Sequence, residues 1–300
     1  MPFRCSVASR DREEDPAGTA STVRSFLLVE NAGPWGTEAL RDARMPEQVR
    51  EHLLSAAALG VRVLLVRRHR GPRRPDGLRV FAARADPGSP WLETAVLDDQ
   101  GSLLDLDLAA LGRGRSLGLP RTDRPVLCVC THGRHDACCA EWGRPTAAAL
   151  AAAHPEPTWE VSHVGGDRFA ANVLVLPAGL YYGRVGPEDA ATLGALHEEG
   201  RLWPALLRGR SGFPLPVQAA EVALRRELQE TRVDGVRLAG TRADQDGTAV
   251  QLTVDHARYE VLVRRRPGDP CRLTCRAARD HVPASYDVVR MGRVEPVTTE

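Results

Sequence analysis

The chain has 300 residues, a formal net charge of +1 and 43% hydrophobic residues, values that suit about two folded domains and exclude a disordered or strongly basic protein. The balanced charge argues against nucleic acid as a partner. All 40 basic residues are arginine, which excludes Schiff-base chemistry and phosphate loops that depend on lysine.

Neither the start of the chain nor any later stretch looks like a membrane segment. The first 20 residues are charged and lack the apolar core of a signal peptide, and the apolar runs are too short to span a bilayer. We therefore expect a cytoplasmic protein without a membrane partner. In that reducing compartment its seven cysteines are expected to be metal ligands or free thiols.

The first part of the chain has an α/β pattern. Strands are predicted at residues 25–30, 61–67 and 78–83, with a helix at 46–59 between the first two. A strand, a helix and a strand in this order predict a parallel pair with a helical crossover. We take residues 1–112 as an N-terminal α/β domain, ending at a connector rich in Gly, Arg and Pro.

A second α/β unit is predicted over residues 125–210. Its helices are expected at 144–153, with Pro145 in the first turn, and at 187–200. Its strands are expected at 125–129, 158–162, 172–176 and 180–185, the last two forming a hairpin.

The remaining residues, 211–300, form the third predicted part. A helical region at 213–230 is followed by short alternating strands over 233–289. Turns are expected at Asp246-Gly247 and Pro267-Gly268. We predict an antiparallel meander packed on the rest of the chain.

The densest group of reactive side chains follows the strand predicted at 125–129. Four of the seven cysteines lie within residues 126–139, namely Cys128, Cys130, Cys138 and Cys139. His132 and His135 lie between them. Thiolates and imidazoles at this density indicate a zinc or iron–sulfur site.

A second loop offers further ligands. Residues 163–169 follow a predicted strand and contain two glycines that permit close backbone approach. Both loops follow strands of the same α/β unit, so they can face each other. Cys130 and Cys139 from one loop, with His163 and Asp167 from the other, would make a four-ligand site.

The other cysteines have simpler interpretations. Cys128 alternates with Cys130 in an apolar strand and is expected to point into the core. Cys5, Cys271 and Cys275 are isolated in sequence, and the spacing of the last two suits packing on one face of a strand. His132 and His135 are expected to be hydrogen-bonding or solvent-facing loop residues rather than ligands.

Several sequence motifs together resemble the sucrase/ferredoxin-like family, whose members include thioredoxin-like [2Fe–2S] proteins. They are Gly18-Thr19-Ala20, Glu30-Asn31-Ala32-Gly33-Pro34-Trp35-Gly36, Cys130-Thr131-His132-Gly133-Arg134-His135-Asp136-Ala137-Cys138-Cys139, Gly143-Arg144-Pro145, His163-Val164-Gly165-Gly166-Asp167-Arg168-Phe169-Ala170 and Leu176-Pro177-Ala178-Gly179-Leu180-Tyr181-Tyr182-Gly183.

The resemblance implies a thioredoxin-like ferredoxin domain over residues 125–210 and a degenerate thioredoxin-like domain over 1–112. It also implies a [2Fe–2S] cluster with two cysteine and two histidine ligands. By position these are Cys130, Cys139 and His163, with Asp167 where the family has its second histidine. Cys138, His132 and His135 remain alternative fourth ligands. His132, Arg168 and Tyr182 are expected near the cluster, where hydrogen-bond donors raise its reduction potential.

The function expected is electron transfer with a protein redox partner, rather than catalysis by the chain alone. The alternatives are a structural zinc module and a thiol-redox protein that uses the adjacent Cys138 and Cys139. Sucrose hydrolysis is not expected, because no recognisable pair of catalytic carboxylates is apparent.

Overall fold

The computed structural model describes residues 2–70 and 77–294. The helices found in these ranges are α1 (Cys5–Asp11), α2 (Glu47–Ser55), α3 (Leu108–Gly112), α4 (Ala137–Ala153), α5 (Ala190–Glu198) and α6 (Leu215–Leu228), with 3₁₀ turns at Ala56–Leu59, Gly101–Asp105 and Asp167–Phe169. The strands are β1 (Ser25–Glu30), β2 (Val61–Arg67), β3 (Leu78–Arg84), β4 (Trp91–Leu97), β5 (Val126–Cys130), β6 (Thr158–Val161), β7 (Val173–Leu176), β8 (Leu180–Tyr182), β9 (Leu207–Arg210), β10 (Arg237–Asp244), β11 (Gly247–Val254), β12 (Ala257–Pro267) and β13 (Ala284–Val294).

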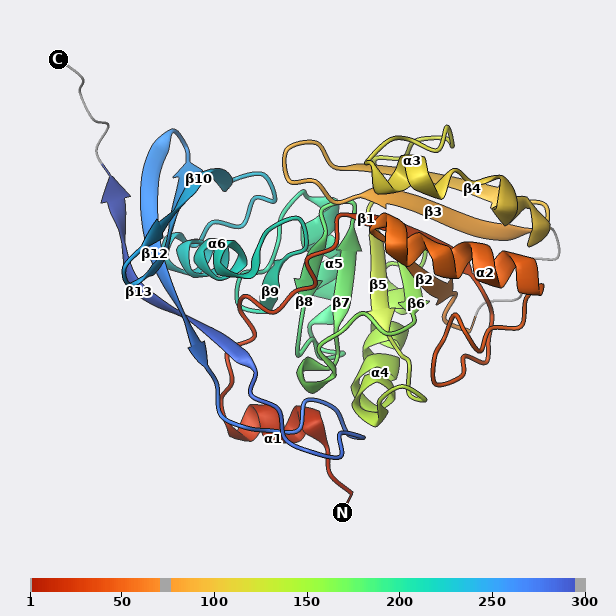
Figure 1. Cartoon of the computed structure of the whole chain (residues 1–300), viewed down its shortest axis with the longest axis horizontal. Helices are drawn as coiled ribbons and strands as arrows, with labels where there is room; N and C mark the ends of the chain where they lie inside the picture. Colours follow the sequence, from red (N-terminus) through yellow and green to blue (C-terminus); the bar gives the residue numbers. More distant parts are fainter. Residues whose placement is uncertain (1, 71–76, 295–300) are drawn as a thin grey trace.

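One large mixed sheet runs through both predicted α/β units (Figure 1). Its nine described strands are ordered β4-β3-β1-β2-β6-β5-β7-β8-β9. The predicted parallel pair is confirmed, since β1 lies parallel to β2, and β5 is likewise parallel to β6. The two halves join where β2 pairs antiparallel with β6. The fold is therefore mixed α/β with a shared sheet, and the division into two thioredoxin-like domains stays a prediction.

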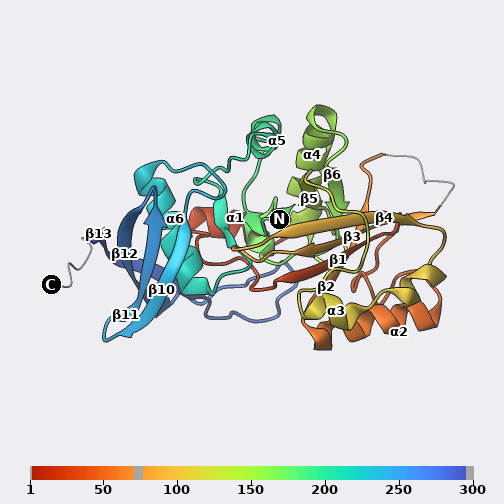
Figure 2. The same ribbon diagram turned by 90° about the horizontal axis from the view of Figure 1, so that it is seen from above.

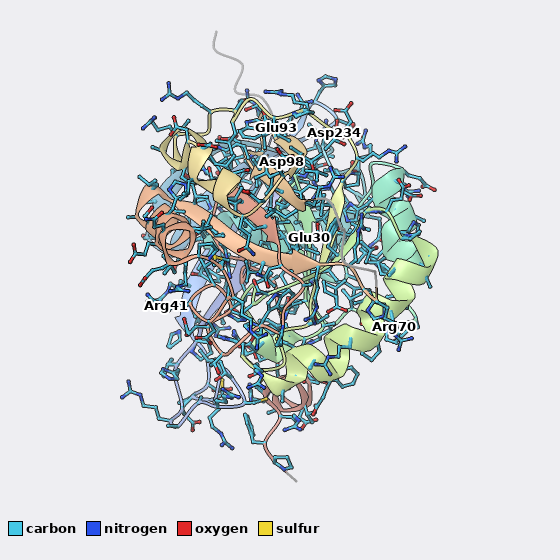
Figure 3. The ribbon with its side chains drawn as sticks, turned by 90° about the vertical axis from the view of Figure 1, so that its right-hand side faces the viewer. Glu30, Arg41, Arg70, Glu93, Asp98 and Asp234 are labelled. Carbon is cyan, nitrogen blue, oxygen red and sulfur yellow. The ribbon has the colours of Figure 1, made fainter. Side chains whose placement is uncertain are left out.

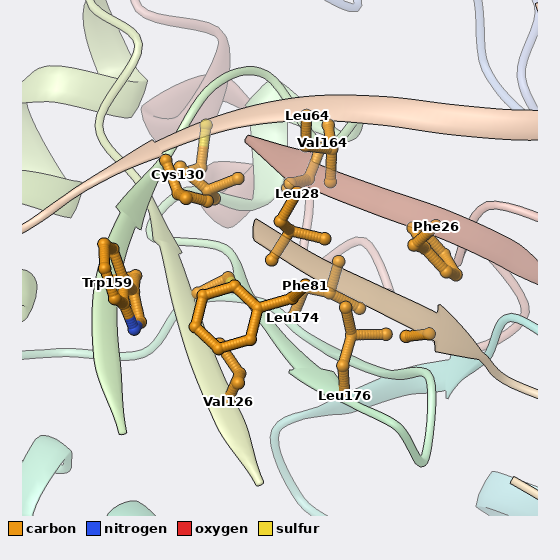
Figure 4. Close-up of a cluster of buried hydrophobic side chains, with 14 of the residues drawn as sticks. Phe26, Leu28, Leu64, Phe81, Val126, Cys130, Trp159, Val164, Leu174 and Leu176 are labelled. Carbon is orange, nitrogen blue, oxygen red and sulfur yellow. The ribbon is translucent and has the colours of Figure 1, made fainter. Parts of the chain in front are cut away.

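The sheet curls so that one face encloses a common core. Phe81 on β3 packs edge-on against Trp159 on β6, with ring centroids 5.4 Å apart. These strands are three positions apart in the sheet, which would separate them by about 14 Å if it were flat. Figure 4 shows Cys130 within the same buried cluster as residues of both halves, such as Leu28 and Leu174.

Helices cover the outer faces of the sheet. Figure 2 shows α2 and α3 on one side, with α4 and α5 on the other. Beneath α2 and α3 lies one apolar cluster, which includes Leu27 and Leu53. Beneath α4 and α5 lies another, which includes Val129 and Leu193. Alternate residues of β1 and β5 thus face the shared core and the helices in turn.

The C-terminal part is a helix on a four-stranded antiparallel sheet, ordered β10-β11-β12-β13 as the predicted meander requires. Helix α6 packs on it through Val217 and Leu224. On the other side α6 is tied to β9 by ion pairs. Buried Glu221 lies 3.2 Å from Arg210 and 2.9 Å from Arg225.

Two predicted boundaries were wrong. Helix α4 begins at Ala137 rather than residue 144, because the Asp136 side chain caps it by accepting from the Cys138 amide. Pro145 consequently lies inside the helix. Pro267-Gly268 is not a tight turn, since a segment without helix or regular strand runs over residues 268–283 before β13 begins.

Charged side chains of both signs project around the end of the molecule drawn in Figure 3, where Glu30, Arg41, Arg70 and Asp98 are labelled. This agrees with the balanced formal charge. Of the helices in the described ranges, none has the length and hydrophobicity needed to cross a bilayer.

Candidate metal centre

The thiols and imidazoles gather where β5 and β6 end. The register pairs Cys130 with Val161, so the two parallel strands finish at the same edge of the sheet. Cys130 is the last residue of β5, and His163 follows β6 by two residues. Helix α4 returns along this edge and brings Cys139 back in its first turn.

Three predicted ligands meet there. The donor atoms of Cys130, Cys139 and His163 all lie within 4.8 Å of one another. The Asp167 Oδ1 lies 3.2 Å from the Cys139 Sγ and 2.9 Å from the His163 Nδ1. His163 and Asp167 also form a second compact group with His135. The structure therefore brings together the four donors that the two loops were expected to supply.

The group is buried on three sides and open on one. Cys130, Cys139 and Asp167 are almost fully buried, whereas the His163 side chain is 28% exposed. A pocket of about 230 Å³, lined by His132, His135 and His163, lies beside it. The imidazole edge is thus the part of the site that solvent or another molecule reaches.

The charges of the group are coupled. The hydrogen bond from Cys139, assisted by His163, lowers the pKa of Cys130 despite its burial. Burial favours neutral His163, but Asp167 outweighs it and raises the pKa of the imidazole. Burial likewise disfavours the Asp167 carboxylate, yet His163 lowers its pKa. The side chains of the site therefore stabilise one another's charges.

One buried nitrogen is left without a hydrogen bond. The His163 Nδ1 approaches Asp167 but has no partner of adequate geometry among the described residues. A buried nitrogen whose close neighbour is poorly aligned for a hydrogen bond is costly, and a metal can use the lone pair of a neutral imidazole. Two thiols, an imidazole and a carboxylate fit the donor chemistry of zinc, and the thiols and imidazole fit that of iron–sulfur centres.

His132 is a hydrogen-bonding residue, as expected. Its Nε2 lies 2.6 Å from the Gly36 carbonyl oxygen, and its Nδ1 accepts from the His163 amide at 3.3 Å. Since a carbonyl only accepts, His132 is neutral with the proton on Nε2. Burial agrees, because it lowers the pKa of His132. Both nitrogens are therefore engaged, and His132 positions the His163 loop.

His135 lies nearer to the ligands than the sequence indicated. Its ring stacks on His163 with centroids 3.7 Å apart, and its Nε2 is 3.7 Å from the Asp167 Oδ2. It covers the open side of the group.

Two glycines hold the second loop in place. Gly165 and Gly166 both have positive φ, at +95° and +79°. A Cβ at Gly166 would lie 2.3 Å from the guanidinium of Arg208. That buried guanidinium donates to Gly165, Asn172 and Thr19. The loop therefore requires glycine here, and Arg208 ties it to the N-terminal segment.

The remaining predicted residues point elsewhere. Cys128 is buried in the core as expected, and this burial raises its pKa. Cys138 belongs to a different group and does not face Cys130. Arg168 pairs with Glu14 at 2.8 Å. Tyr182 lies on the opposite sheet face, where its hydroxyl is 2.9 Å from the His197 Nε2.

About two thirds of the chain matches a known protein family. Residues 16–209 match the model of the sucrase/ferredoxin-like family. The chain belongs to that family. Neither the curated proteins nor the solved structures contain a significant match.

The family match contains all four candidate ligands of this group, from Cys130 to Asp167, but excludes Cys5 and Cys275. Both cysteines are isolated in sequence, and Cys275 was expected to pack on one face of a strand with Cys271, whereas it lies in the segment between β12 and β13. They meet Cys138 and Asp136 in a second compact group. Only tertiary folding brings the two ends of the chain together, so the spacing of residues gave no signal.

Proposed function

We propose that this chain holds a [2Fe–2S] cluster on Cys130, Cys139, His163 and Asp167 and transfers electrons to a protein partner. The observation that carries the proposal is the convergence of two buried thiols, an imidazole and a carboxylate at one sheet edge. Membership of the sucrase/ferredoxin-like family supports iron–sulfur chemistry over other uses of these ligands.

A cluster bound here would supply one-electron redox chemistry. Two of the proposed cluster ligands lie on regular elements, since Cys130 is the last residue of a central strand and Cys139 lies in the first turn of a 17-residue helix. Buried Asp167 makes the donor set more anionic than a second histidine would. Compared with a site of two cysteines and two histidines, this lowers the expected reduction potential.

The open imidazole edge suits the approach of a redox partner. His163 and His135 are each more than a quarter exposed, while both thiols are buried. A partner that docks over these rings would come closest to the ligands without exposing the sulfurs to solvent. We place the docking surface on this edge.

A mononuclear zinc site is the second candidate. The short distances among Cys130, Cys139 and His163 also suit a single ion with tetrahedral ligands. Anaerobic purification followed by iron, sulfide and zinc analysis separates the two candidates. A cluster gives equal iron and sulfide with visible absorbance, whereas zinc gives a colourless protein.

Paired alanine variants test the ligand assignment. Cys139→Ala removes a proposed ligand, and Cys128→Ala removes a buried core thiol of the same size. We expect Cys139→Ala to lose iron and visible absorbance and Cys128→Ala to retain both. Full iron content in folded Cys139→Ala would overturn the assignment.

A further inference from the structure

A second group of thiols lies on the other side of the start of α4. Cys5 comes from α1, Cys138 from the first turn of α4, and Cys275 from the segment between β12 and β13. Figure 1 shows this segment running beside α1, near α4. Cys5 and Cys138 form a small buried cluster with Ala170, and Cys275 packs against it in a partly buried position.

The sulfur atoms are spaced like the ligands of one tetrahedral ion. The Sγ of Cys275 lies 3.4 Å from that of Cys138 and 3.6 Å from that of Cys5. The Cys5 Sγ lies 3.7 Å from both carboxylate oxygens of Asp136. Zinc–sulfur bonds of about 2.3 Å imply sulfur–sulfur edges of about 3.8 Å in a tetrahedral site.

Asp136 is held in position by the backbone on both sides. One oxygen accepts from the Cys138 amide at 2.9 Å, and the other accepts from the Cys275 amide at 2.6 Å. The same carboxylate thus caps α4 and fixes the C-terminal segment. Each oxygen keeps a further lone pair for an ion.

The carboxylate of this group is held by hydrogen bonds rather than by a cationic side chain. Asp136 is completely buried, and its hydrogen-bond partners among the described residues are the amides of Cys138 and Cys275 and the Cys5 thiol. Arg4 and Arg10 lie near Cys138 instead. A buried carboxylate without a cationic partner is costly. Three thiols beside it add no compensating charge, whereas a divalent ion would.

A further polar atom is unsatisfied at the same place. The Ser6 hydroxyl is buried without a hydrogen-bond partner of adequate geometry among the described residues, although Ser6 approaches Cys138. A metal-bound thiolate is a better acceptor for this hydroxyl than a neutral thiol.

We propose that Cys5, Cys138, Cys275 and Asp136 bind a structural zinc ion, separate from the centre at Cys130 and Cys139. Cys5, Cys138 and Asp136 are fully buried and Cys275 is partly buried, and four protein donors are the complement of a structural site. Binding would release the thiol protons to solvent and join both ends of the chain to α4. The proposal is independent of what the first centre holds.

Metal analysis of matched variants tests this assignment. Cys275→Ala should lose about one zinc ion per chain while keeping iron and visible absorbance. Cys271→Ala, which removes a buried thiol four residues away, should keep both metals. Cys139→Ala should lose iron and keep the zinc. If the first centre holds zinc instead, the wild type has about two zinc ions, and each of Cys139→Ala and Cys275→Ala loses one.

A cobalt titration covers the case in which Cys275→Ala does not fold. Cobalt(II) added to metal-free Cys130→Ala/Cys139→Ala protein should give thiolate-to-cobalt absorption, and adding Cys275→His should keep binding but reduce that absorption. Unchanged zinc content in Cys275→Ala would overturn the proposal. So would a disulfide among these cysteines, detected by mass in the freshly isolated protein, or absence of cobalt binding.

Discussion

Gly143 lies directly against the carbonyl oxygen of Cys130. A Cβ at Gly143 would be only 1.9 Å from that oxygen. Since Cys130 ends β5 and Gly143 lies in α4, this contact sets how closely the helix approaches the strand. It thereby fixes the separation of Cys130 and Cys139, although Gly143 offers no ligand itself.

Gly143→Ala is expected to push α4 away from β5 and separate the two thiols. Overpacking of this kind typically costs about 1–3 kcal/mol. We expect a lower melting temperature and loss of most bound iron. Gly240→Ala is the control, because a Cβ there meets no atom within 4 Å. Normal iron content in Gly143→Ala would show that the contact does not set the ligand spacing.

Asp167 variants test the fourth ligand. Asp167→Ala should lose iron, because it removes an oxygen donor beside Cys139 and His163. Asp167→His should keep the cluster with a higher reduction potential, because imidazole is neutral where carboxylate is anionic. Cys138→Ala should keep the iron, since Cys138 faces the other group. Iron analysis and redox titration give the readouts, and full retention in Asp167→Ala contradicts the assignment.

The buried ion pairs of Glu221 should be important for stability. Glu221→Ala leaves Arg210 and Arg225 buried without their carboxylate. Breaking a buried pair in this way costs roughly 3–5 kcal/mol. Denaturant unfolding should show this loss, while exposed Glu227→Ala on the same helix stays within about 0.5 kcal/mol of the wild type. Equal midpoints for the two variants would refute the prediction.

His197 should make the protein less stable in acid. Burial lowers the pKa of His197 from 6.5 to about 4. Near pH 7 both folded and unfolded states are neutral at this residue. Below pH 6.5 the unfolded chain takes up a proton that the folded one refuses, so stability falls towards pH 4 by on the order of 3 kcal/mol.

His197→Gln removes this titration and still offers Tyr182 a hydrogen-bond partner. Its unfolding free energy should therefore decline less steeply between pH 6.5 and 4 than that of the wild type. Parallel curves for the two proteins would show that His197 does not titrate in this way.

Local patterns predicted much of the fold. Apolar runs gave the strands β1, β2, β5 and β7, and alternation gave the C-terminal meander. The start of α4 was missed because Pro145 looked like a first-turn residue, whereas the helix begins after the Asp136 cap, more than two turns before Pro145. Capping depends on one side chain rather than on a periodic pattern, so it is easily overlooked.

The group of Cys130, Cys139, His163 and Asp167 could be proposed because these residues lie at or shortly after the ends of two strands of one unit. The contact of Cys5 with Cys275 could not, because it spans 270 residues and depends on how two sheets and α1 pack. The curl of the sheet that brings Phe81 against Trp159 could not be predicted from the sequence for the same reason. Tertiary contacts between elements that are distant in the chain produce no periodic pattern in the sequence.

The closeness of Cys5 to Cys275 has a thermodynamic consequence if a zinc ion joins them. Such a link would turn almost the whole chain into a closed loop. Loop-entropy models give a cross-link of this size on the order of 5 kcal/mol, through restriction of the unfolded chain. The folded state can then be stable even if each of its other contacts contributes little to the free energy of unfolding. Removal of the ion by a chelator would free both ends at once.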